Sequence, residues 1–219
     1  MHQRRIVLLF LFLFLATAPS RGAETSPGAI IEQNAAKAVA AIQKRSQHSS
    51  LDVGAIRTIF IETMEPLFDY REMTLRTLGR YARKYGKDRK GIEELTGVFR
   101  EFLRQLFRTT LLPKTEFEHL KEVRVTDELI KGRYARVKTQ SIVETSGETS
   151  VLDVNYMLVR HGKTWQIYDM EIDGYGIVGS YRSQFASVLK NHGLKDLIQR
   201  LREKTAEMKR EETSKKKTS

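Results

Sequence analysis

The spacing of apolar residues along this chain changes twice. Before about residue 118 they recur every three or four positions, the period of an amphipathic helix. From there to about residue 172 they alternate with polar residues, as in a strand with one buried face. Helical spacing then returns. The pattern predicts an α+β chain with N-terminal helices, a central sheet and C-terminal helices.

Four helices are predicted in the N-terminal part. The first covers residues 29–45, and the second begins after Asp52 and ends or kinks at Pro66. Asp69 with Glu72 three residues later forms a capping-box pattern, typical of a helix start. The apolar residues of this third helix are Leu75, Leu78, Ala82 and Tyr85.

The fourth helix is predicted to follow Asp88 and to end before Pro113. Its apolar stripe contains Ile92, Leu95, Phe99, Phe102, Leu103 and Leu106. Arg100, Arg104 and Arg108 recur every four residues on the other side, and we interpret them as a solvated basic edge.

The alternating region predicts a four-stranded antiparallel meander. A first strand begins near residue 118, and three more cover about 133–144, 149–160 and 164–172. Each connection is short and contains a glycine, which permits only antiparallel neighbours. One face is expected to carry Leu152, Val154, Tyr156 and Leu158 with Tyr168, Met170 and Ile172, and the opposite face Asp153, Asn155 and Asp169.

Two helices and a tail complete the predicted order. After a turn at Asp173 and Gly174, a helix runs to Asn191, where Gly193 provides a left-handed end. A last helix follows. Residues 209–219 contain no apolar side chain, which predicts a disordered basic tail.

Charge and cysteine content narrow the function classes. The chain of 219 residues has 38 basic and 27 acidic residues, a net charge of +11, and no cysteine, which excludes disulfides, thiolate metal sites and cysteine nucleophiles. A basic start, an apolar run of eleven residues and small residues before residue 24 predict a signal peptide over residues 1–23. Its removal takes away three arginines and leaves a net charge of +8, and the signal peptide predicts an exported protein.

The distribution of charge argues against a nucleic-acid partner. Residues 200–219 contain eight basic and four acidic residues, so half of the remaining positive charge is terminal. We interpret the tail as steering the protein toward anionic lipid or an acidic docking face. Strongly salt-dependent retention on DNA would favour the alternative of a nucleic-acid binder.

Catalytic and cofactor motifs give little support for an enzyme. Gly174, Gly176 and Gly179 match G-x-G-x-x-G, but the strand before them ends an antiparallel meander and no later strand completes a βαβ unit. The five histidines are scattered, and we expect neither a metal site nor a cofactor. An isomerase-like enzyme with a carboxylate base beside Tyr156 or Tyr168 stays an alternative, although Asp153 and Asp169 are expected on the opposite face.

Two blocks of sequence carry a family resemblance. Residues 68–81, FDYREMTLRTLGRY, and residues 165–174, WQIYDMEIDG, followed by YRSQF at 181–185 and GLKDLI at 193–198, resemble the MlaC family. Members of this family are periplasmic phospholipid-binding components of a Gram-negative lipid transport system, also called toluene-tolerance proteins. The resemblance covers the leader and residues 28–208; the related hopanoid-associated HpnM branch is an alternative.

The resemblance implies a fold, a cargo and partners. It implies a cone-shaped α+β fold related to nuclear transport factor two, with residues 24–208 as a lipid-binding domain and acyl chains held between sheet and helices. The implied partners are phospholipid, an inner-membrane ABC complex and an outer-membrane lipoprotein complex; we expect a monomer without catalytic residues. By pattern alone the large apolar residues favour an ordinary core, and it is the resemblance that implies a lipid cavity. The residues expected to line it are Met73, Leu78, Phe99, Phe102, Leu106, Tyr156, Tyr168, Met170, Ile172, Val178, Tyr181 and Phe185.

Overall fold

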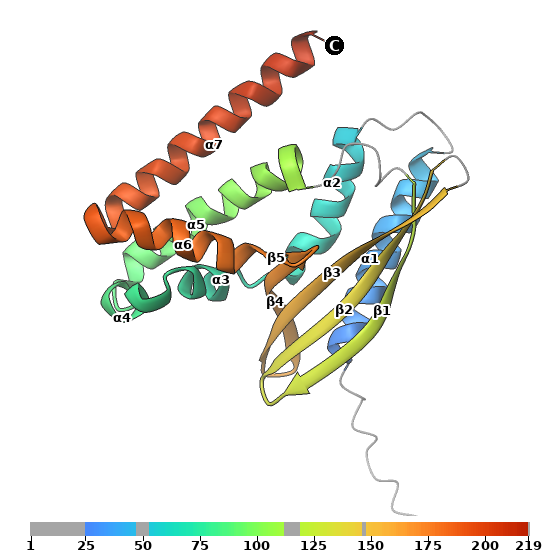
Figure 1. The fold of residues 1–219 in the computed structure, drawn as a ribbon, viewed down its shortest axis with the longest axis horizontal. Helices are drawn as coiled ribbons and strands as arrows, with labels where there is room; N and C mark the ends of the chain where they lie inside the picture. The colour runs from blue at the N-terminus through green and yellow to red at the C-terminus, as the bar shows by residue number, and fades with distance from the viewer. Residues whose placement is uncertain (1–24, 47–52, 112–118, 146–147, 219) are drawn as a thin grey trace, which may run out of the picture.

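A curved antiparallel sheet and a group of helices lie side by side in the computed structural model (Figure 1), which describes residues 25–46, 53–111, 119–145 and 148–218. The predicted signal peptide, Asp52, Pro113 and Gly147 lie outside the described residues. In this view the helices of residues 70–106 and 177–218 lie on the side of the sheet where its last strands are, while the helix of residues 27–46 follows one face of the sheet. The predicted α+β class is confirmed.

The sheet is a meander in sequence order: β1 Leu120–Lys131, β2 Tyr134–Thr145, β3 Glu148–His161, β4 Thr164–Ile172 and β5 Tyr175–Gly176. All neighbours are antiparallel, so the predicted meander is confirmed with a fifth, two-residue strand in addition. The turns at Gly132 and Gly162 have positive φ angles of 61° and 60°. Asp173 and Gly174, with φ of 48° and 83°, form the turn that adds β5, as Asp-Gly pairs do in tight hairpins.

A bulge in β4 changes the faces expected for this strand. Met157 pairs with Asp169 and Leu158 pairs with Ile167, which leaves Tyr168 as an extra residue. Trp165 and Ile167, both buried, therefore share the inner face with Met170. The prediction that Tyr168 shares that face is wrong, because strict alternation does not survive a bulge.

The helix α1 Pro27–Ser46 packs against β1 and β2 on one face of the sheet, and α2 Val53–Met64 packs against α1. A carboxylate from β1 fixes the start of α1: Glu128 Oε2 accepts hydrogen bonds from the Gly28 backbone N–H at 2.8 Å and from the Ser26 hydroxyl at 3.1 Å. Donors at a helix start have no partner within the helix, and an acidic side chain satisfies them. The 3₁₀ turn η1 Glu65–Leu67 follows α2 and contains Pro66.

The third predicted helix is divided into three pieces: α3 Tyr70–Thr77, η2 Gly79–Tyr81 and α4 Ala82–Tyr85. Asp69 caps it as expected, since its Oδ1 accepts from the Glu72 N–H at 2.8 Å. The break occurs at Gly79, which has φ of +51°, a left-handed conformation that favours glycine. Apolar spacing predicted continuity here because it carries no information on a single left-handed residue.

The remaining helices are α5 Arg89–Leu106, with a π-helical extension η3 Phe107–Leu111, then α6 Ile177–Asn191 and α7 Gly193–Thr218. Asp88 caps α5 through a hydrogen bond from the Gly91 N–H, and Gly193 has the expected left-handed φ of 86°.

The C-terminal tail differs from the expected disorder, because α7 continues through Thr218. Two contacts with α5 support the extension: Lys209 Nζ lies 2.6 Å from Glu101 Oε1, and Gln105 Nε2 donates to Glu212 Oε2 at 2.8 Å. Met208, 8% exposed, belongs to the main hydrophobic core. Composition predicted a tail without a core of its own, but the tail packs on another helix.

Candidate functional site

An apolar cavity of about 20 Å³ lies between the N-terminal helices and the inner face of the sheet. Its lining residues come from α1, α2 and four strands: Ala35, Phe60, Leu120, Val123, Ser141, Leu152, Val154, Tyr156, Met170 and Ile172. The Tyr156 side chain is almost completely buried, and this burial raises the pKa of its hydroxyl. The hydroxyl is therefore neutral at every physiological pH, and the cavity carries no charge from it.

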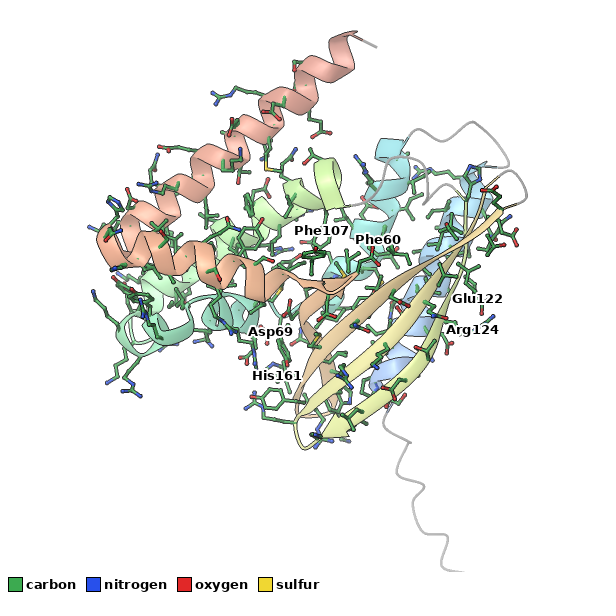
Figure 2. All side chains as sticks on the ribbon, viewed as in Figure 1. Phe60, Asp69, Phe107, Glu122, Arg124 and His161 are labelled. Atoms are coloured by element: carbon green, nitrogen blue, oxygen red, sulfur yellow. The ribbon has the colours of Figure 1, made fainter. Side chains whose placement is uncertain are left out.

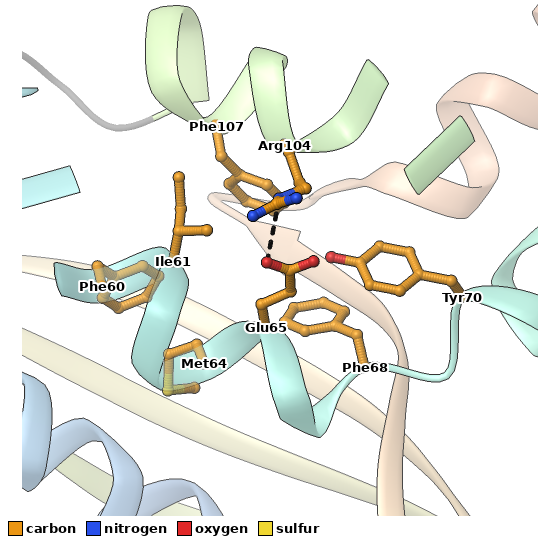
Figure 3. A pocket seen from close by; sticks show the side chains of 8 residues that line it. All are labelled: Phe60, Ile61, Met64, Glu65, Phe68, Tyr70, Arg104 and Phe107. Carbon is orange, nitrogen blue, oxygen red and sulfur yellow. Dashed lines mark ion pairs between the residues drawn. The ribbon is translucent and has the colours of Figure 1, made fainter. Parts of the chain in front are cut away.

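A second cavity of about 20 Å³ lies beside the first, between α2, η1 and α5 (Figure 3). Its apolar lining consists of Phe60, Ile61, Met64, Phe68 and Phe107. Phe60 lines both cavities, and its side chain together with Phe107 occupies the junction of sheet and helices (Figure 2). We call the two together the Phe60 cavities.

One side of the second cavity is charged. Glu65 Oε2 lies 3.1 Å from Arg104 Nε, and Glu65 Oε1 lies 2.7 Å from Arg100 Nη2. The Glu65 side chain is only 10% exposed. Tyr70 lines the same side, with its hydroxyl directed toward the Glu65 carboxylate (Figure 3). We call Glu65, Tyr70, Arg100 and Arg104 the charged rim.

Burial and charge act together on Tyr70. Burial raises the pKa of its hydroxyl most, and the Glu65 carboxylate raises it further, while Arg100 and Arg104 act in the opposite direction. The hydroxyl stays protonated and able to donate. Arg100 and Arg104 are therefore not merely the solvated basic edge expected from their spacing, because both are ion-paired with one largely buried acid.

Each Phe60 cavity has room for little more than one water molecule. A larger apolar guest has to displace side chains such as Phe60 and Phe107. This displacement is feasible where the guest replaces the contacts that the side chains lose, because apolar attraction is not directional.

Three of the twelve predicted lining residues line a Phe60 cavity: Tyr156, Met170 and Ile172. Four others form an aromatic cluster between α5 and α6 instead. In this cluster Phe99 contacts Phe185 at 5.2 Å and Tyr181 at 5.5 Å between ring centroids, and Phe102 contacts Tyr181 at 5.3 Å. Phe102, Tyr181 and Phe185 also line a surface pocket of about 160 Å³ toward α7. Burial raises the pKa of Tyr181 to about 12.

The other predicted lining residues lie elsewhere. Met73, Leu78 and Val178 are fully buried in the main core, and Leu106 packs against it. The ring of Tyr168 contacts Tyr134 of β2 at 6.1 Å, and the Arg76 guanidinium lies 3.8 Å from its centroid. Tyr168 thus joins the sheet to α3 rather than lining a cavity.

Apolar spacing alone does not mark the residues around Phe60 as the lining of a cavity. Helical spacing places Phe60 and Met64 in the second predicted helix, which is expected to end or kink at Pro66. The density of large apolar residues from Phe60 to Phe68 on both sides of a proline was a usable signal, because a chain that turns there exposes several faces to the core.

Asp169, an acidic residue near the tyrosines, is engaged at the start of a helix. Asp169 Oδ1 accepts hydrogen bonds from the backbone N–H groups of Met170 and Val178, each at 2.9 Å, and so holds the start of α6. Burial raises the pKa of Asp169, although these two hydrogen bonds act in the opposite direction. Among the described residues, the lining of the cavity around Tyr156 includes no carboxylate.

Within residues 25–46, 53–111, 119–145 and 148–218, no helix is long and apolar enough to cross a bilayer. In the same part of the chain, no three His, Cys, Asp or Glu side chains are grouped to hold a metal ion.

Known proteins resemble this chain in both sequence and fold. The family model described as MlaC protein matches residues 32–203. Over 206 residues the chain is 23% identical to the intermembrane phospholipid transport system binding protein MlaC of Haemophilus influenzae, with 92% of each sequence covered. The solved structure of a phospholipid-binding protein from Ralstonia solanacearum in complex with a phospholipid superposes with a TM-score of 0.61 at 18% identity, covering 83% of this chain and 97% of that one.

Proposed function

Because this chain belongs to the MlaC family, we propose that it binds the acyl chains of a phospholipid in the Phe60 cavities and carries the lipid through the periplasm. The observation that carries this proposal is the pair of apolar cavities that share Phe60 between the sheet and the helices. The proposed partners are an inner-membrane ABC complex and an outer-membrane lipoprotein complex. This agrees with the name of the Haemophilus relative, an intermembrane transport system binding protein.

Physical chemistry explains why such a carrier is needed. A phospholipid with about 30 methylene groups exposes apolar surface worth about 24 kcal/mol when it leaves a bilayer, at about 0.8 kcal/mol per group. A carrier has to offer an apolar interior close to that of the bilayer, because much tighter binding would prevent release. The Phe60 cavities meet this need with aromatic and methionine side chains that can move apart.

A closed interior also fits a carrier between deliveries. Phe60 and Phe107 line the second cavity, so an acyl chain that enters it has to displace them. On loading, the chain replaces these contacts. We propose that Phe60 is the first side chain to move, since it alone belongs to the lining of both cavities among the described residues.

Lipid extraction tests the proposal directly. The protein purified without detergent is expected to contain phospholipid, detected by intact-mass and lipid mass spectrometry. Phe60→Asp places a charge between the cavities and should abolish the bound lipid. Val151→Asp, at a side chain that is 54% exposed, is the matched control and should retain it. A lipid-free wild type, or lipid retained equally by both variants, contradicts the proposal; a hopanoid in the extract would favour the HpnM-like alternative.

A further inference from the structure

We propose that Arg100 and Arg104 form the binding site for the phosphate of the lipid headgroup, and that Glu65 occupies this site when no lipid is bound. The inference rests on the proposed lipid carriage and adds the part of the ligand that the apolar cavities leave unassigned. Its structural basis is the charged rim: Glu65, Tyr70 and Arg104 line the second Phe60 cavity, and Arg100 is ion-paired with Glu65.

Geometry favours a phosphate at this place. Arg100 and Arg104 lie one turn apart on α5, and both direct guanidinium groups at the same carboxylate, Glu65. Arg100 makes two contacts with Glu65 Oε1, from Nη2 at 2.7 Å and from Nε at 2.8 Å. Converging guanidinium groups bind phosphate oxygens as well as carboxylates, with several donors at fixed angles. The neutral Tyr70 hydroxyl adds a donor on the same side.

Position in the fold links the site to the lipid. Glu65, Tyr70 and Arg104 line the same cavity as Phe60 and Phe107, so the charged and apolar parts meet in one pocket (Figure 3). A lipid with its acyl chain among the phenylalanines would leave its phosphate at the rim. Arg104 also lies 4.0 Å from Glu101, but that carboxylate binds Lys209, and Glu65 is the closer partner.

Glu65 then acts as an internal competitor. A phosphate and the Glu65 carboxylate require the same donors, so one must leave when the other binds. The Glu65 carboxylate is 10% exposed and lies beside apolar side chains. While no phosphate is bound, it balances the positive charges of the two arginines. Its removal should therefore strengthen phosphate binding without altering apolar contacts.

Two lipids that differ only in phosphate test this inference. Equilibrium binding is measured for phosphatidylglycerol and for diacylglycerol with the same labelled acyl chains, delivered from cyclodextrin. Wild-type protein is expected to bind phosphatidylglycerol about tenfold more tightly, and the R100Q/R104Q variant should lose this preference while keeping its affinity for diacylglycerol. Glu65→Gln should raise the affinity for phosphatidylglycerol about fivefold and leave that for diacylglycerol unchanged.

Matched controls separate this site from general charge effects and from folding. Glu94→Gln removes an exposed carboxylate of the same helix that pairs with Arg202 at 2.8 Å, and it should change neither affinity. Arg104→Lys keeps the charge but loses the planar fork, so a partial loss of phosphate preference is expected in a protein with a wild-type circular dichroism spectrum.

The outcomes distinguish the inference from the proposed function beneath it. If wild type binds neither lipid, lipid carriage itself fails and the phosphate site with it. If wild type binds both lipids equally, or if the arginine variant weakens both equally, only the phosphate site is overturned. If wild type binds inorganic phosphate as tightly as phosphatidylglycerol, the natural ligand of the site is a free anion, and the assignment to a lipid headgroup is overturned.

Discussion

His161 Nε2 lies 2.7 Å from Asp69 Oδ2, which joins the end of β3 to the start of α3 (Figure 2). The same carboxylate caps α3 through its other oxygen, and the Asp69 backbone N–H donates to the Ile167 carbonyl at 2.8 Å. Sheet and helices therefore meet at one aspartate with three separate contacts.

The helix cap and the histidine contact at Asp69 should contribute different amounts to the free energy of unfolding. Asp69→Ala is expected to lower the free energy of unfolding by about 1–2 kcal/mol, because an N-cap is lost. His161→Ala should cost no more than about 0.5 kcal/mol, since the His161 side chain is 45% exposed and water competes for its contact with Asp69. Urea unfolding measures both. Asp69→Ser retains a helix cap but loses the histidine contact. If it lowers the free energy of unfolding as much as Asp69→Ala does, the larger contribution of the cap is contradicted.

Gly79 and Gly97 should respond in opposite ways to alanine. Gly79 has φ of +51°, and an added Cβ would lie 3.1 Å from the Arg182 side chain, so Gly79→Ala is expected to destabilise by about 1–2 kcal/mol. Gly97 lies in the interior of α5 with open space around the Cβ position, and Gly97→Ala should stabilise by about 0.5–1 kcal/mol. Thermal unfolding of the two variants gives the comparison; equal effects would refute it.

Asp169 should make stability depend on pH. Because its pKa is raised in the folded state, mainly by burial, folding binds protons in the range just above pH 3.8. The stability from this group is therefore fully present below its unfolded pKa and is lost as the pH rises through the folded pKa. Asp169→Asn lacks this loss, so its stability relative to wild type should increase from pH 3 toward neutral pH. A constant difference in urea titrations across this range would show that the prediction is wrong.

Deletion of residues 209–219 should affect both packing and association. The positive residues of this segment are expected to attract anionic surfaces. Without them, the rate of association with anionic vesicles at low salt should fall, while lipid occupancy is unchanged.

Within this segment, Lys209 also holds the pKa of Glu101 below its usual range through a hydrogen bond. The stability that this contact adds is present above the unfolded pKa of Glu101 and is lost as the pH falls. Lys209→Gln removes the contact with Glu101 and keeps the rest of the tail. If deletion of residues 209–219 leaves the rate of association with anionic vesicles unchanged, electrostatic steering by the tail is excluded.

Local patterns predicted the elements well. The strands near 133–144, 149–160 and 164–172, the caps at Asp69 and Asp88 and the left-handed Gly193 all depend on residues close together in the sequence. The errors share a different cause. The bulge at Tyr168 depends on the register with β3, and the helical tail depends on contacts with α5, and neither partner is visible in a window of neighbouring residues.

In the candidate site, too, some features follow from the sequence and others only from the tertiary structure. By itself the sequence determined the order of elements, the meander and the resemblance to a lipid-binding family, because periodicity and short motifs depend only on residues close together in the chain. Only the tertiary structure decided that Tyr156, Met170 and Ile172 line a cavity, whereas Phe99 and Phe185 pack on one another. It also brought Glu65 to Arg100 and Arg104. An apolar side chain has the same pattern in a core as in a cavity, and only the neighbours it meets from distant segments distinguish the two.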